Sequence, residues 1–135
     1  MEEFLPVFSE QYAYISGGKE RVNLQYESQL HQSDLATLLR ENTERDRSAQ
    51  YTTSGIHKDD LHFEIEGFPM KKYGSQGQQK SFLIALKLSQ FKILQQELGI
   101  TPIVLLDDIF DKLDDTRVTQ LVQLVTQKHF GQLFI

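Results

Sequence analysis

Two short stretches of this sequence carry residues that could bind a phosphate group and a divalent cation. The first holds Ser75, Gly77 and Gln78 in a turn that immediately precedes a long helical pattern. The start of a helix presents free backbone N–H groups and partial positive charge, which suit an anion such as phosphate. The second is the pair Asp107 and Asp108, which follows an apolar run. One carboxylate could hold Mg²⁺ through water, and the other could orient or deprotonate an attacking water.

Each stretch also has a simpler structural interpretation when it is considered alone. Ser75 could be an ordinary N-cap, because short glycine- and serine-containing motifs match often. The two carboxylates could mark only the exit of a strand, since adjacent side chains of a regular strand point to opposite faces. The close succession of the two stretches, with one helix between them, favours the nucleotide interpretation.

Charge is unevenly distributed along the chain, whose formal net charge is −5. This total argues against a protein that coats nucleic acid by bulk attraction. Residues 67–96 include several lysines and no acid, whereas residues 107–115 are dominated by aspartates. A phosphate site beside a cation site requires such neighbouring elements, although two differently solvated faces would give the same pattern. The lysines are Lys71, Lys72, Lys80, Lys87 and Lys92.

The composition is that of a globular protein, with 39% hydrophobic and 24% charged residues in a chain of 135. We expect a single domain with a core of its own. There is no cysteine, which excludes disulfides, thiolate catalysis and zinc sites built on sulfur. The histidines lack metal-ligand spacing. No apolar stretch is long enough for a membrane helix and no signal peptide is evident, so we expect a cytoplasmic protein without a membrane partner.

Periodicity predicts the elements that precede the two stretches. Alternation over 22–26 and over 61–66 predicts two half-buried strands, the second of which enters a hairpin or turn. Between them, Ser33 is a plausible N-cap for a helix that reaches about Arg47 and packs one leucine face inward. Residues 1–18 show no clean period, and we interpret them as the tail of an upstream element entering a turn. An antiparallel layer is therefore expected first.

The pattern of the second half of the chain predicts a helix, a strand, a helix and a strand, in that order. Apolar residues cover most of the circumference of 76–98, as in a helix buried on several sides, and Gly99 can end it. The run 103–106 predicts a buried strand, 116–128 an amphipathic helix and 133–135 the start of another strand. This order implies a right-handed crossover and a parallel sheet. The predicted fold class is therefore α/β.

The sequence resembles the C-terminal half of an ABC-type ATPase head. Residues 73–79 are similar to the signature motif, 103–108 to Walker B and 111–114 to the D-loop. The match extends to the RecF family of bacterial recombination and repair proteins, within an SMC-like superfamily. It covers nearly the whole chain, which would be a C-terminal fragment. Its motifs are Ile15-Ser16-Gly17-Gly18-Lys19-Glu20, Gly55-Ile56-His57-Lys58-Asp59-Asp60-Leu61 and Lys71-Lys72-Tyr73-Gly74-Ser75-Gln76-Gly77-Gln78-Gln79-Lys80.

This resemblance implies a role for each candidate residue. Ser75, Gly77 and Gln78 would contact the γ-phosphate of ATP held by a second subunit. Asp107 would be the Mg²⁺-associated acid and Asp108 the catalytic carboxylate. ABC transporters usually carry glutamate at the position of Asp108, whereas aspartate is normal for the RecF family.

The resemblance also implies partners and a cycle. Asp114 would lie at the seam of an ATP-dependent homodimer, and Lys71 and Lys72 could contact a DNA backbone, although a solvated loop is an equal alternative. The dimer would clamp DNA at gaps and at junctions of single- and double-stranded DNA. It would assist recombinase loading with RecO- and RecR-like proteins and open on slow, DNA-dependent ATP hydrolysis.

The chain lacks the other half of a nucleotide site. A P-loop ending at Gly18 and Lys19 would need glycine at Ala13 and Ser or Thr at Glu20, so no Walker A motif is present. We therefore expect this piece alone to bind ATP and Mg²⁺ weakly or not at all and to hydrolyse nothing. Two alternatives stay open: the head of another chromosome-maintenance or RecN-like ATPase, and a non-catalytic interaction domain that kept the fold.

Overall fold

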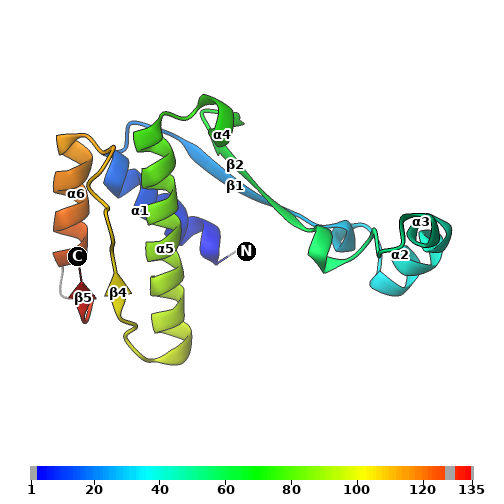
Figure 1. Cartoon of the computed structure of the whole chain (residues 1–135). Coiled ribbons are helices and arrows are strands. Elements are labelled where there is room, and N and C mark those ends of the chain that lie inside the picture. The colour runs from blue at the N-terminus through cyan, green and yellow to red at the C-terminus, as the bar shows by residue number, and fades with distance from the viewer. Residues whose placement is uncertain (1–2, 127–129, 135) are drawn as a thin grey trace. The chain divides into compact units, whose positions relative to one another are not determined.

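The computed structural model describes residues 3–126 and 130–134 of the chain. Contacts divide the chain into two compact units (Figure 1). One unit comprises Met1–Asn23 and Phe63–Ile135, and the other comprises Leu24–His62. All the residues predicted to handle nucleotide belong to the first unit.

Helix α5 (Gln76–Leu98) is the central element of the first unit. Its predicted ends are confirmed: Ser75 is the N-cap and Gly99, with a φ of 64°, is the left-handed C-cap. Its buried face packs on α1 (Phe4–Ser16), which also contacts α6 (Asp115–Thr126). One stripe of α5 is nevertheless open, because Leu83 is 57% exposed. The expectation of burial on several sides is therefore only partly correct.

Helix α1 was not predicted as a regular element, although the turn after it was. Its buried residues include Phe8, Tyr12 and Ile15, which recur at intervals of four and three along one helical face. The chain then leaves the helix through Gly17, whose φ is 67°. The core forms where α1 meets α5: the ring of Phe82 lies 4.7 Å from that of Phe8 and 6.0 Å from that of Tyr12.

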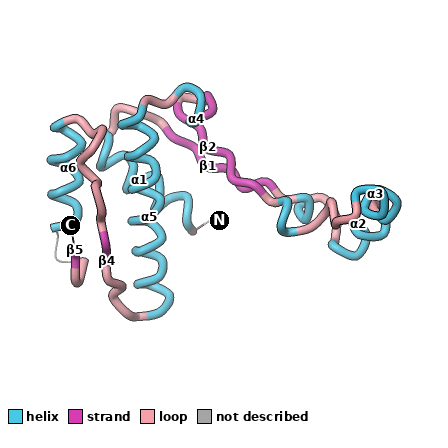
Figure 2. Tube along the Cα trace, in the orientation of Figure 1, coloured by secondary structure: helices cyan, strands magenta, loops and turns pink. Residues whose placement is uncertain are grey.

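Strand β4 (Val104–Leu105) pairs in parallel with β5 (Leu133–Phe134), as the sequence predicted (Figure 2). The prediction of a buried strand is wrong, because only Val104 is buried, whereas Ile103 is 60% and Leu105 74% exposed. A parallel strand is buried on both faces only where other elements cover both. Among the described residues, β4 has a strand neighbour on one edge alone.

An antiparallel layer precedes α5, also as predicted. The sheet order is β1 (Val22–Glu27), β2 (Asp60–Ile65) and β3 (Phe68–Pro69). Strands β2 and β3 form a hairpin whose two connecting residues, Glu66 and Gly67, both have positive φ. This is the conformation that a two-residue hairpin turn favours. The short helix α4 (Met70–Tyr73) then leads into α5.

The second unit contains η1 (Gln29–His31), α2 (Leu35–Glu41), α3 (Thr43–Ala49) and η2 (Ile56–Lys58). The prediction of one helix capped by Ser33 is wrong in two respects. Asp34 is the N-cap, since its side chain accepts a hydrogen bond from the Thr37 backbone N–H. The helix also breaks at Asn42, whose side-chain amide donates to the Leu38 carbonyl oxygen over 2.9 Å.

The leucines of α2 do not form a buried face, which corrects the expectation of inward packing. None of the residues of α2 is buried, and Leu35 is 45% exposed. No helix of the described part of the chain has the length and apolar character that crossing a membrane requires.

Candidate nucleotide half-site

The turn 75–78 is a complete capping box at the start of α5. The Ser75 hydroxyl accepts a hydrogen bond from the Gln78 backbone N–H at 3.2 Å, and the Gln78 side-chain oxygen accepts one from the Ser75 N–H at 2.7 Å. Reciprocal bonds of this kind satisfy two donors and fix the direction of chain entry. The N–H groups of Gln76 and Gly77 belong to the first helical turn, which offers them no intrahelical acceptor. They are the backbone donors available to an anion.

The side chain of Gln78 is fully engaged within the protein. Its oxygen closes the capping box, and its Nε2 donates to Oε1 of Glu20 over 2.9 Å. A direct side-chain contact with phosphate would require these bonds to be exchanged. The structure therefore gives Gln78 a structural task, and its predicted contact with the γ-phosphate stays a prediction. Ser75 is exposed and Gly77 half-buried at the same turn.

Gly77 allows the turn 75–78 to approach the loop that follows β4. A Cβ atom at Gly77 would lie 2.9 Å from the backbone carbonyl oxygen of Lys112, which is closer than a side chain tolerates. Any residue larger than glycine would force the two segments apart. The same glycine that the sequence assigns to phosphate approach is thus required for contact within the chain.

Residues 107–114, here termed the acidic loop, lie beside the start of α5. Asp107 and Asp108 are both exposed, and the Lys80 ammonium donates to the backbone carbonyl oxygen of Asp108. Asp108 adopts a positive φ of 51°, so the chain leaves the regular strand geometry at this residue. The strict alternation of neighbouring side chains ends there. The structure thus brings the start of α5 and the backbone of the acidic loop together, and the predicted roles of the two carboxylates stay predictions.

The described residues alone do not complete a metal site. They contain no group of three or more His, Asp or Glu that could hold a metal ion. Mg²⁺ in nucleotide sites usually takes one or two carboxylates and completes its shell with phosphate oxygens and water. The exposed carboxylate of Asp107 fits one position of such a shell, with the remaining ligands coming from nucleotide, water or other chain segments.

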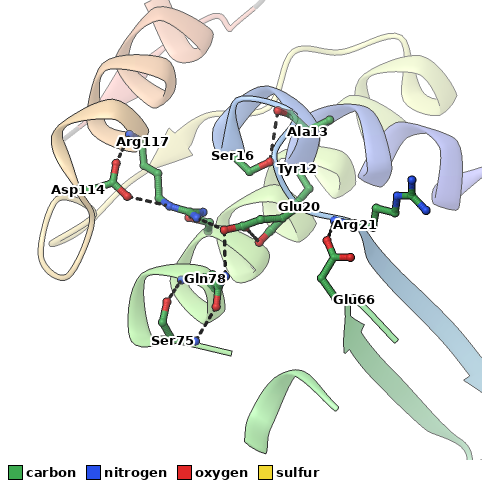
Figure 3. Close-up of polar contacts among 11 residues, drawn as sticks. Tyr12, Ala13, Ser16, Glu20, Arg21, Glu66, Ser75, Gln78, Asp114 and Arg117 are labelled. Carbon is green, nitrogen blue, oxygen red and sulfur yellow. Dashed lines mark hydrogen bonds and ion pairs between the residues drawn. The ribbon is translucent and has the colours of Figure 1, made fainter. Parts of the chain in front are cut away.

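Arg117, at the first turn of α6, connects the acidic loop to the rest of the site (Figure 3). Its Nε donates to Asp114 Oδ2 over 3.0 Å, and its Nη2 donates to Glu20 Oε1 over 2.5 Å. Its remaining nitrogen Nη1 donates to the Ser81 hydroxyl, on α5, at 3.0 Å. Asp114 also accepts from the Arg117 backbone N–H, in the manner of an N-cap. One guanidinium therefore holds three separate segments.

Glu20 is the common acceptor of this cluster. Its Oε1 accepts from Gln78 and Arg117, and its Oε2 accepts from the Tyr12 hydroxyl at 2.6 Å. Burial raises the pKa of Glu20, but hydrogen bonds from Tyr12, Gln78 and Arg117 outweigh it and lower the pKa below the ordinary value. Burial, together with the neighbouring Glu20, raises the pKa of Tyr12 far above its ordinary value. Glu20 is thus ionised and Tyr12 neutral at physiological pH.

Comparisons with known proteins agree on one family. No family model matches the chain. The DNA replication and repair protein RecF of Flavobacterium johnsoniae is 59% identical over 135 residues, which are 100% of this chain and 38% of that protein. The RecF protein of Parabacteroides distasonis is 52% identical over 135 residues, covering 100% of this chain and 37% of that protein.

Solved structures give the same answer. Two chains match 98% of this chain with TM-scores of 0.72 and 0.73 and identities of 27% and 26%. They are described as the recombination mediator protein RecF-ATPrS and RecF-ATP, both in the RecFOR pathway. The chain belongs to the RecF family. It spans 38% and 37% of the length of the two curated RecF relatives and corresponds to their C-terminal portion. The α/β fold class is confirmed by the same matches.

Sequence reasoning missed the residues that join this RecF site together. Glu20 was considered only as a mismatch to a P-loop and as the last residue of a RecF-like motif, without a structural role, and Arg117 was not singled out. The one local signal was the spacing of Asp114 and Arg117, since an acid and a base three apart can pair at a helix start. The link from Arg117 to Glu20 spans 97 positions and has no local signature.

Lys71 and Lys72 lie on α4 of this RecF chain and are exposed. The Lys72 ammonium sits 5.3 Å from the centroid of the Tyr73 ring, a cation–π distance. Both ammonium groups are available to a polyanion, and the predicted contact with DNA stays a prediction.

A groove of about 480 Å³ runs between α5 and β4, next to the acidic loop. Leu83 lines it from the helix, Ile103 and Leu105 line it from the strand, and Lys80 and Asp107 stand at one end. Most of the side chains that line this groove are apolar.

Proposed function

We propose that this chain supplies one half of an ATP site in a RecF-type protein of DNA replication and repair. The proposal is supported by the RecF relatives and by the solved structures described as RecF-ATPrS and RecF-ATP. The observation that carries it is the contact between the turn 75–78 and the acidic loop, through Gly77 against Lys112 and Lys80 against Asp108. Two short sequences with nucleotide-site character therefore share one rim.

In this proposal, the turn 75–78 binds the γ-phosphate of ATP held by a second subunit. The Ser75 hydroxyl and the first backbone N–H groups of α5, including that of Gly77, act as the donors. Gln78 keeps the turn rigid, because its backbone N–H donates to Ser75 and its side chain bonds to Ser75 and Glu20. ATP then closes two heads into a homodimer, with Asp114 near the seam.

In the same proposal, the acidic loop, which lies beside the start of α5, performs the chemistry. Asp107 provides a carboxylate for Mg²⁺, and Asp108 orients or deprotonates the attacking water. A Mg²⁺ ion held there would supply positive charge that offsets the charge of the phosphate groups. The remaining phosphate-binding elements come from a Walker A segment outside these residues.

The ATP-dependent dimer binds DNA at gaps and at junctions, and it assists recombinase loading together with RecO- and RecR-like proteins. The similar solved structure is of a recombination mediator in the RecFOR pathway, which supports such partners. Lys71 and Lys72 offer exposed cations for a phosphate backbone. Hydrolysis reopens the dimer.

The test is the substitution Asp108→Asn in the full-length protein. We expect ATP hydrolysis to be lost while ATP-driven dimers persist or accumulate, because the amide cannot accept a proton. Asp115→Asn, an exposed aspartate just outside the acidic loop, is the matched control and should hydrolyse ATP normally. Hydrolysis by Asp108→Asn at the wild-type rate would overturn the catalytic assignment.

The same preparation separates the enzyme from a non-catalytic interaction domain. A wild-type protein that neither binds ATP nor dimerises with it would favour the interaction domain. The isolated 135-residue chain should hydrolyse no ATP in either case, and turnover by it would contradict the half-site proposal.

A further inference from the structure

We propose that Glu20 and Arg117 are positioning residues that hold the turn 75–78 and the acidic loop in one fixed register. Neither residue needs to touch nucleotide in order to act. They act through Gln78 on one side and through Asp114 on the other. This inference rests on the proposed function, because it assigns the pair a task in assembling that same half-site.

The geometry of Glu20 is the first argument. A single oxygen, Oε1, accepts from Gln78 Nε2 at 2.9 Å and from Arg117 Nη2 at 2.5 Å. Gln78 belongs to the capping box that shapes the turn 75–78. Because the two donors share one acceptor atom, a displacement of either segment changes the bond to the other.

The geometry of Arg117 is the second argument. A guanidinium is a rigid planar fork, so its donors cannot adjust independently. The Arg117 fork contacts Asp114 in the acidic loop, Ser81 on α5 and Glu20 after α1. The relative placement of these three segments is therefore fixed by one planar group.

The burial of the pair is the third argument. The side chain of Arg117 is 11% exposed and that of Glu20 is 16% exposed. Water therefore has little access to replace either partner, and a charge left unpaired here would be costly. The ion pair between Lys92 and Glu10 is the natural contrast, because it is more exposed and lies away from the turn 75–78. It joins α5 to α1 without reaching the half-site.

A purely stabilising role would give a different result from a positioning role. Stabilisation alone predicts a lower melting temperature with normal turnover by the folded molecules. Positioning predicts that folded molecules bind ATP normally through the other half of the site, yet dimerise and hydrolyse poorly. Misplacement of groups by about 1 Å can cost roughly 100-fold in rate, so the two roles are separable.

The experiment uses the full-length protein with the substitutions Glu20→Gln, Arg117→Lys and the double substitution. Glutamine keeps the shape of Glu20 and an oxygen for Gln78 and Arg117, but removes the charge. Lysine keeps the charge of Arg117 but cannot reach Asp114, Ser81 and Glu20 with one rigid fork. Glu10→Gln is the matched control, because it neutralises a carboxylate of a different ion pair, which joins α1 to α5 away from the turn 75–78.

We expect each single substitution to lower kcat and to weaken ATP-driven dimerisation by about 10- to 100-fold. The affinity of the monomer for ATP, measured at protein concentrations too low for dimers, should be unchanged. In Glu10→Gln, kcat, ATP-driven dimerisation and ATP affinity should all equal those of the wild type. The double substitution should cost less than the product of the two single effects, because both disturb one network. If Glu20→Gln does not fold, Arg117→Lys tests the proposal with the same expected results.

Folded variants with normal kcat and normal ATP-driven dimers would overturn the positioning role and leave the proposed function intact. Multiplicative effects of the two substitutions would also count against a shared network. Wild-type protein without ATP-driven dimers would instead overturn the proposed function itself, so the two failures are distinguishable.

Discussion

The side chain of Gln78 donates a hydrogen bond to Glu20 over 2.9 Å, although 58 positions separate the two residues. This bond fixes the capping side chain of α5 against the segment that follows α1. The segment is in turn bound to the first turn of α6 through Arg117. The start of α5 is thus held by tertiary contacts in addition to its own cap, which gives each of the following substitutions a definite expected effect.

Ser75→Ala removes the acceptor of the capping box. We expect a loss of about 0.5–2 kcal/mol in the free energy of unfolding, because the Gln78 backbone N–H loses its partner. Urea denaturation of the full-length protein would measure it. A midpoint equal to that of the wild type would show that the cap contributes nothing.

Ser75→Asp separates capping from anion binding. Aspartate is as good an N-cap as serine, so the free energy of unfolding should be retained. A negative charge at the proposed phosphate contact should nevertheless abolish ATP-driven dimerisation, which analytical ultracentrifugation can follow. Normal dimers in this variant would mean that no phosphate approaches Ser75.

Gly77→Ala places a methyl group 2.9 Å from the Lys112 carbonyl oxygen. We expect the acidic loop to shift and the free energy of unfolding to fall by about 1–3 kcal/mol, as for other overpacked sites. Thermal denaturation would measure the change. Gln76→Ala, one position earlier in the same turn, is exposed and should change it by less than about 0.5 kcal/mol.

Lys80→Met removes the ammonium that holds the Asp108 carbonyl oxygen. We expect faster amide hydrogen exchange in the acidic loop, because that loop loses a link to α5. Lys87→Met, on the same helix but further from its start, is the control. Equal exchange in the two variants would mean that the Lys80 contact does not restrain the loop.

Lowering the pH should reduce the free energy of unfolding, partly because Glu20 becomes protonated. Its folded pKa is lower than that of an unfolded chain, about 4.3, so its contribution is complete above that pH and is lost as pH falls through the folded pKa. Glutamine does not titrate. The difference in free energy of unfolding between wild type and Glu20→Gln should therefore shrink as the pH falls from neutral to below about 4.3. A difference that is constant over this range would contradict the low pKa.

The elements with local signals were predictable from the sequence. Ser75 and Gly99 marked both ends of α5, and alternation predicted β1 and β2. The break at Asn42 was not predictable from hydrophobic pattern, because it depends on a side chain competing for a helix carbonyl. Helix α1 was missed for a different reason. Its buried residues Phe8, Tyr12 and Ile15 follow a helical spacing, but polar residues and Pro6 around them hide that pattern in the sequence.

The proximity of the two candidate segments was predictable from the sequence, but the contacts that hold them together were not. The turn 75–78 and the acidic loop were expected on one rim, and the structure brings them together through Gly77 and Lys80. The contacts of Glu20 and Arg117 were not predictable, because hydrogen bonds between distant segments depend on the packing of α1, α5 and α6. The exposure of Leu105 was missed for the same reason: burial depends on neighbours elsewhere in the chain.

The open face of β4 has a practical consequence for this chain in isolation. An exposed apolar surface lies next to the edge of β4 and is formed by Leu83, Ile103 and Leu105. Exposed apolar surfaces beside strand edges promote aggregation. Recombinant preparations of the 135 residues alone should therefore tend towards insolubility and chaperone capture. Co-expression with the complementary piece of a RecF protein is the rational route to soluble material.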